Sequence, residues 1–151
     1  MKKLLILLSL ATVAWAKPSV IARCPSTGAG FDVDFSQKYK KVKQDAGAAY
    51  GWESSTMPLQ SQFVLLTDHK DAAHLKAHLT KHMPSGCRIT AERPFHRGKL
   101  KGLELEGLNE SGMPFVVRLF STPAHGFVYG SFTYDLAQNR HFVDSFRIVP
   151  K

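Results

Sequence analysis

The closing stretch of the chain, residues 127–148, constrains the fold most, because it reads as a buried strand followed directly by a helix. The strand half, Phe127 to Tyr134, carries apolar or aromatic side chains on both faces, which is typical of a central strand. Asp135 is a suitable N-cap, whose carboxylate would accept hydrogen bonds from the first free amides of the helix. The pattern therefore predicts a helix that packs back on its own sheet.

The closing helix has one apolar face at helical spacing, and we expect that face to lie on the sheet. Asn139 and Arg140 are expected on the opposite face, and His141 and Ser145 at the helix surface. Phe146 should be among the most buried residues of the chain. The expected apolar face consists of Leu136, Phe142, Val143 and Phe146.

A second helix is predicted over residues 68–82, capped by Thr67 or Asp68 and stopped by Pro84 and Gly86. The other segments alternate as strands, with a turn expected at residues 94–97, and their hairpin-length connections favour antiparallel pairing. The fold class predicted is α+β, with one twisted antiparallel sheet. The expected buried stripe of the helix is Ala72, Leu75, Leu79 and Met83. The expected strands are residues 31–35, 39–44, 48–54, 62–67, 88–92, 98–106, 115–121 and 127–134.

The first 16 residues have the pattern of a secretory signal peptide. Lys2 and Lys3 precede an apolar run, which ends in an A-x-A cleavage site at residues 14–16 and is too short to span a bilayer. We expect residues 1–16 to be removed, residues 17–27 to form a lead-in, and residues 28–151 to form a single domain. The protein is then periplasmic or secreted, with no transmembrane segment after cleavage.

The chain is basic, and the charge bears on its partners. Its formal net charge of +8 falls to +6 when Lys2 and Lys3 leave with the signal. An exported basic protein meets acidic proteins, lipid head groups and envelope polymers, so nucleic acid is the poorer candidate. Two basic clusters fit either a contact surface for an acidic partner or strand edges protected against aggregation. They are Lys38, Lys40, Lys41 and Lys43, and then Arg93, His96, Arg97, Lys99 and Lys101.

Cys24 and Cys87 are the two cysteines, and export makes a disulfide between them the favoured prediction. The alternative is two separate buried thiols.

One flank of the predicted helix carries possible metal ligands, because imidazoles four residues apart can share zinc or copper. The residues on this flank are Asp71, His74, His78 and His82. A polar helix flank without metal is the interpretation that the sequence favours.

Glu104 and Glu106 lie on one side of a predicted strand, and paired carboxylates can do acid–base chemistry in a cleft. Alternation with Leu103 and Leu105 favours the solvated face of an amphipathic strand instead, where Arg118 could pair with one glutamate across strands. No catalytic residue is predicted.

The order of several motifs resembles the PsbP-like domain over residues 28–149. These motifs are GFDVDFSQKYKK, QFVLLTDHKDAAHL, GLELEG, PFVVRLF, GFVYGSFTY and RHFVDSFRIV, with Arg118 in the penultimate strand. The resemblance implies an α/β/α sandwich around a central antiparallel sheet. Members of the family include an extrinsic photosystem subunit, a nuclear-import factor that binds a small GTPase, and exported bacterial proteins of unassigned role. A photosystem-binding N-terminal arm is not recognisable here, so that role is not carried over.

The function predicted is that of an exported, non-enzymatic binding or accessory protein, which acts through protein–protein contacts with an envelope protein or acidic surface. The family resemblance implies the absence of chemistry of its own. The alternative is a periplasmic metal-binding protein that uses His74, His78 and His82.

Overall fold

The computed structural model describes residues 22–23, 30–36, 40–44, 47–54, 60–67, 71–123 and 125–149. The predicted signal peptide and most of the lead-in lie outside these ranges. Within them, no helix is long and apolar enough to cross a membrane. The α+β class and the antiparallel sheet are confirmed.

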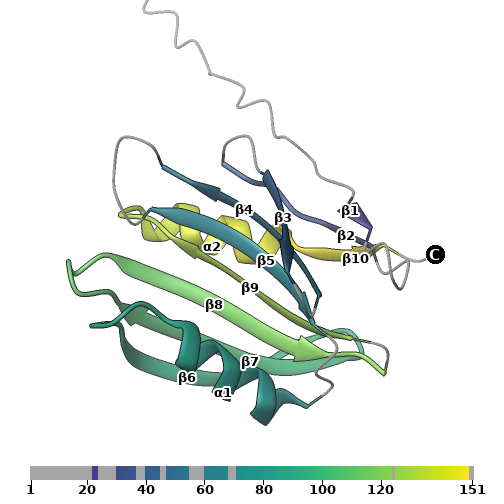
Figure 1. The fold of residues 1–151 in the computed structure, drawn as a ribbon. Helices are drawn as coiled ribbons and strands as arrows, with labels where there is room; N and C mark the ends of the chain where they lie inside the picture. The colour runs from purple at the N-terminus through teal and green to yellow at the C-terminus, as the bar shows by residue number, and fades with distance from the viewer. Residues whose placement is uncertain are drawn as a thin grey trace, which may run out of the picture.

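Seven antiparallel strands form a large sheet in the order β3-β4-β5-β9-β8-β7-β6 (Figure 1). A small second sheet, β1-β2-β10, was not predicted. In it, β10 directly follows the closing helix and pairs with β2. The strands are β1 (Ala22–Arg23), β2 (Gly30–Asp32), β3 (Lys40–Gln44), β4 (Gly47–Glu53), β5 (Ser61–Thr67), β6 (Arg88–Arg97), β7 (Leu100–Leu108), β8 (Pro114–Ser121), β9 (Gly126–Phe132) and β10 (Arg147–Val149).

The two helices, α1 (Ala72–His82) and α2 (Leu136–Ser145), cover opposite faces of the large sheet (Figure 1). Alternate residues of β9 separate the two cores. Phe127 and Tyr129 pack with α2 and the small sheet, whereas Val128 packs with α1. The structure therefore has a helix on one side, and a helix with a small sheet on the other.

The prediction that β9 is a central, two-sided strand is confirmed, because all its residues are buried between β5 and β8. Tyr134 was expected to continue the strand and is instead 54% exposed. The strand ends at Phe132, and the chain turns at Asp135 into α2, so the alternation does not reach Tyr134. Asp135 is the N-cap as predicted, and its Oδ1 accepts from the amides of Ala137 and Gln138.

The buried stripe of α2 is shifted by one turn from the predicted one. Phe142, Val143 and Phe146 are buried as expected, but Leu136 is 48% exposed and Asn139 is fully buried. Residues 139, 142, 143 and 146 follow the i, i+3, i+4, i+7 spacing of one helix face. Leu136 lies a turn before that stripe, at the first residue of the helix.

Asn139 is tolerated in the core because every polar atom of its amide has a partner. Its Oδ1 accepts from Ser131 Oγ at 2.7 Å and from Thr133 Oγ1 at 2.9 Å. Its Nδ2 donates to the carbonyls of Pro114 and Thr133 at 2.9 and 3.0 Å. A buried amide with all its hydrogen bonds fixes the position of α2 on β8 and β9.

The side of α2 that was predicted to face solvent also makes tertiary contacts. Ser145, predicted at the helix surface, is half-buried, and its Oγ accepts from the Asp34 amide at 2.9 Å. His141 is exposed as predicted, with its Nε2 3.2 Å from the Asp34 carboxylate. The segment after β2 therefore lies along α2, which the chain order alone does not indicate.

Helix α1 begins later than predicted. Asp71 is its N-cap and accepts from the Ala73 amide at 3.0 Å, so Thr67 does not cap it, and Asp68 lies outside the described residues. Its apolar stripe is confirmed: two of the four residues are buried and two are partly buried against the same core. They are Leu75 and Leu79, and then Ala72 and Met83.

The turn predicted at residues 94–97 is wrong, because β6 continues through Pro94 to Arg97. β6 is an edge strand, where a proline without an amide hydrogen is tolerated. The turn falls instead at Gly98 and Lys99, where Gly98 has a positive φ of 59°. This places a hairpin tip at residues 96–101, in which Leu100 still packs against the core while Lys99 and Lys101 are exposed.

Candidate functional site

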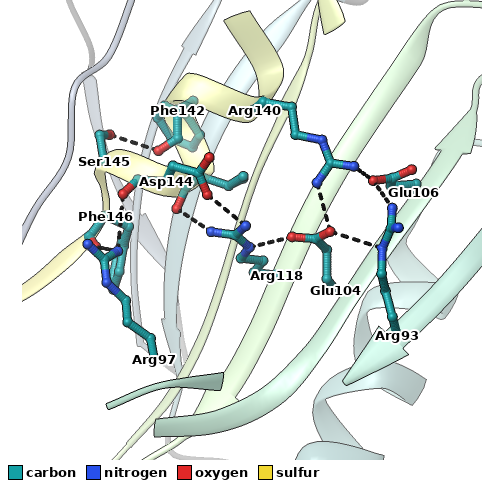
Figure 2. Close-up of polar contacts among 11 residues, drawn as sticks. Arg93, Arg97, Glu104, Glu106, Arg118, Arg140, Phe142, Asp144, Ser145 and Phe146 are labelled. Carbon is teal, nitrogen blue, oxygen red and sulfur yellow. Dashed lines mark hydrogen bonds and ion pairs between the residues drawn. The ribbon is translucent and has the colours of Figure 1, made fainter. Parts of the chain in front are cut away.

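A cluster of charged side chains lies between the large sheet and α2, which we call the ion network (Figure 2). Its members are Arg93, Glu104, Glu106, Arg118, Arg140 and Asp144. They come from β6, β7, β8 and α2, four elements that adjoin at this position. The network brings three arginines and three carboxylates together on this side of the sheet.

Glu104 is at the centre of the ion network. It faces Arg118 directly across β7 and β8, and Arg118 Nε donates to its Oε2 at 2.6 Å. The predicted cross-strand pair is thus confirmed. The expectation that Glu104 faces solvent is wrong, since the residue is only 6% exposed. Helix α2 covers this face and adds Arg140, whose Nη1 donates to Glu104 Oε1 at 2.8 Å.

The charge of Glu104 is held by its neighbours. Burial raises the pKa of its carboxyl, but hydrogen bonds and charges from Arg140 and Arg118 outweigh burial and leave the pKa below its usual value. Arg93 Nε lies 3.3 Å from Oε1 as a third cation. Glu106 is partly exposed and binds Arg93 and Arg140 at the rim. Glu104 is therefore ionised at neutral pH, where a general acid would need to hold a proton.

Arg118 joins β8 to the end of α2. Its Nη1 donates to the Val143 carbonyl at 3.0 Å and its Nη2 to the Asp144 carboxylate at 2.7 Å. Its guanidinium also lies over the Phe95 ring, 4.5 Å from the centroid. Burial lowers the pKa of Arg118, but Glu104 and Asp144 outweigh this and raise it, so the side chain stays charged.

Arg97 binds the same helix end from the edge strand. Its Nη1 donates to the carbonyls of Asp144 and Phe146, which α2 leaves unpaired at its C-terminus (Figure 2). A polar pocket of about 440 Å³ opens beside the ion network. It is lined by Pro94, Phe95, His96, Arg97, Glu104, Arg118 and Asp144.

The structure separates the two predicted basic clusters. Lys40, Lys41 and Lys43 are on β3, at one edge of the large sheet, with Lys40 exposed; Lys38 lies outside the described residues. The second cluster is at the opposite edge, on β6 and β7. The two clusters therefore cannot form one continuous contact surface, although the first lies on edge strand β3 and most of the second on edge strand β6, as the protective interpretation expects.

The second basic cluster divides further by what its members contact. Arg93 and Arg97 turn toward the ion network and α2. Lys99 and Lys101 are exposed at the hairpin tip and have no ion pair with any residue that the structure describes. The sequence alone gave no means of telling these two kinds of basic residue apart.

The predicted metal-ligand set is only partly described. His74 is exposed, with its Nδ1 3.1 Å from the Asp71 carboxylate, and His78 is half-buried. The side chain of His82 lies outside the described part. In that part, no three potential ligands are grouped as a metal site would need. A zinc or copper site on this helix stays a prediction.

Calorimetric titration with zinc and copper tests the histidine flank. A site predicts heat that the His78→Ala variant abolishes, because His78 is four residues from both other histidines. His96→Ala, which removes an exposed histidine of β6, is the matched control and should change nothing. A polar flank predicts no heat at millimolar metal, and the sequence favours that result.

The predicted disulfide also stays open. Cys87 is a half-buried free thiol, whose pKa is raised by burial, and Cys24 lies outside the described residues. If the two form a disulfide after export, thiol labelling under denaturing, non-reducing conditions should modify neither cysteine. Labelling of both without prior reduction would show two separate thiols.

Comparisons with protein-family models and with curated proteins found no match for this chain. The resemblance to the PsbP-like domain therefore rests on the motifs quoted above, and function has to be argued from the site.

Proposed function

We propose that this protein is an exported, non-enzymatic binding or accessory protein of the cell envelope with a PsbP-like fold. Its partner would be an envelope protein or another surface that presents acidic groups. The contact would be made by the hairpin tip, residues 96–101. The predicted signal peptide supports export, and the basic charge supports an acidic partner.

One observation carries this proposal: the hairpin tip presents exposed cations, and two arginines of the same hairpin anchor it to the rest of the protein. Lys99 and Lys101 are exposed, while Arg93 and Arg97 of the same hairpin are bound to the ion network and to α2. An anchored hairpin loses less conformational freedom on binding than a mobile one. Lysines that have no carboxylate partner among the described residues are available for an acidic surface.

The absence of chemistry is a second part of the proposal, supported by how the buried charges are used. Glu104 is bound by arginines that keep it ionised, and Arg118 donates to Glu104, Val143 and Asp144. These bonds join α2 to the sheet. Groups committed to such structural contacts are poorly placed to exchange protons with a substrate.

Affinity capture from the envelope fraction at increasing salt tests the proposal. A partner bound through Lys99 and Lys101 should be lost from the Lys99→Glu/Lys101→Glu variant and released by salt, since exposed charge contacts are screened. Lys81→Glu and Lys40→Glu make the same change elsewhere on the surface and should retain it. Equal capture by all variants would contradict a contact at the hairpin tip.

A further inference from the structure

An apolar pocket of about 210 Å³ lies between the hairpin tip and β10. The aromatic part of its wall is buried, whereas Leu100 and Ile148 are only half-buried where they pack against that core. A group that enters from outside would therefore contact mainly Leu100 and Ile148. We call this pocket the apolar socket; it is lined by Phe95, Arg97, Leu100, Phe120, Tyr129, Phe146, Arg147 and Ile148.

The size and lining of the apolar socket fit a single apolar side chain. Its volume is below the roughly 300–1,000 Å³ typical of small-molecule sites. The Tyr129 hydroxyl is buried and offers no contact to an entering group. Covering the half-buried Leu100 and Ile148 with an apolar group is favourable in proportion to the apolar area removed from water.

The apolar socket adjoins the exposed charge of the hairpin tip. Arg97 and Leu100 are opposite each other in the β6–β7 pairing, and the exposed Lys99 is at the turn between them. On the other side of the socket, Arg147 lies opposite Asp32 in the β2–β10 pairing, so its charge has an acidic neighbour. An acidic group of a partner is therefore best matched at Lys99, the residue next to Leu100.

We propose that the apolar socket receives an apolar side chain of the same acidic partner that contacts the hairpin tip. This binding mode rests on the proposed function and specifies the partner's chemistry: a side chain of about the size of leucine next to an aspartate or glutamate. The apolar side chain packs between Leu100 and Ile148, and the neighbouring carboxylate lies at Lys99. Binding energy at interfaces is concentrated where an anchor side chain fills a pocket, whereas exposed charges mainly set orientation and association rate.

Three synthetic peptides test this binding mode by NMR titration of the purified protein. They are acetyl-Gly-Asp-Leu-Asp-Gly-amide and two variants, one with alanine in place of leucine and one with asparagine in place of both aspartates. We expect saturable shifts at the amides of Leu100 and Ile148 with the leucine peptide. The alanine peptide should bind about tenfold more weakly, because it lacks the apolar group. The asparagine peptide should also bind more weakly, because it has no carboxylate for Lys99.

Ile148→Trp is the decisive variant, because it fills the apolar socket from β10, outside the hairpin tip. It should weaken binding of the leucine peptide about tenfold, whereas Ile148→Val leaves the socket open and should bind like the native protein. Urea midpoints check that both variants fold, and the comparison of the leucine and alanine peptides on the native protein depends on neither. Equal binding of those two peptides, unchanged affinity in Ile148→Trp, or no saturable shift with the leucine peptide would overturn the proposal.

Failure of the apolar socket and failure of the proposed function give different results. If the leucine and alanine peptides bind equally and Lys99→Glu/Lys101→Glu abolishes the binding of both, the contact at the hairpin tip stands without the socket. If the leucine peptide is preferred but keeps its affinity in Lys99→Glu/Lys101→Glu, the acidic contact at the hairpin tip is contradicted, and the proposed partner with it.

Discussion

Replacing Phe146 by alanine should destabilise the protein by about 3–5 kcal/mol, as large-to-small changes at buried aromatic positions do. Phe146 is 2% exposed, and its ring stacks on Tyr129 and Phe31 and meets Phe120 and Phe127 edge to face. It joins α2, the large sheet and the small sheet in one core. Equilibrium denaturation in urea should show the loss as a lower midpoint.

Leu136→Ala is the matched control, because it shortens an apolar side chain on the same helix. Leu136 is 48% exposed, so we expect a change within about 0.5 kcal/mol. Ser145→Ala would be a poorer control, since its hydroxyl bonds to the Asp34 amide and the Phe142 carbonyl. If Phe146→Ala cost no more than Leu136→Ala, α2 would not pack on the sheet as described.

The second large effect is expected at Glu104, where Glu104→Ala should cost about 3–5 kcal/mol. Removing Glu104 takes away the buried carboxylate partner of Arg118 and leaves its buried guanidinium with Asp144, whose side chain is 62% exposed, as its carboxylate partner among the described residues. Glu92→Ala on the neighbouring strand is the control: Glu92 pairs with Lys76 at an exposed position, so its loss should cost at most about 1 kcal/mol. Similar costs for both variants would show that the ion network contributes little to docking α2.

The ion network also predicts how stability depends on pH. The pKa of Glu104 is lower in the folded chain than its ordinary value of 4.5. Its stabilising contribution is therefore complete above that value and is lost as the pH falls through the lower folded value. The native protein should thus lose stability more steeply below about pH 4.5 than Glu104→Gln does, as measured by urea midpoints between pH 7 and pH 3. Parallel pH profiles would count against an ionised, arginine-bound Glu104.

Much of the fold could be predicted because local patterns determine it. The two-sided apolar pattern of β9 and the Asp135 cap were sufficient to place a central strand before α2. The predictions that were wrong depended on tertiary contacts. The sequence pattern makes Leu136 look like a core residue and Asn139 like a surface residue. In the fold, Leu136 is exposed, and Asn139 is buried because β8 and β9 supply hydrogen-bond partners for its amide. Likewise, Pro94 predicts a turn from the sequence alone, because the sequence does not show that β6 is an edge strand, where proline is tolerated.

The site was harder to predict than the fold. Alternation along β7 correctly puts Glu104 and Leu105 on opposite faces of the sheet, but it cannot show that α2 covers the face that carries Glu104. The cross-strand pairing with Arg118 was accessible from the sequence, whereas the contributions of Arg140 and Arg93 depend on how α2 and β6 pack there.

Site-specific photo-crosslinking in the producing cell tests the proposed function most directly. A photoreactive residue placed at Lys99 should give a covalent adduct with an envelope protein, because the hairpin tip is proposed to contact the partner. The same group at Lys81, exposed on α1, should give none. No adduct from position 99, or the same adducts from positions 99 and 81, would contradict a binding protein that acts through this hairpin.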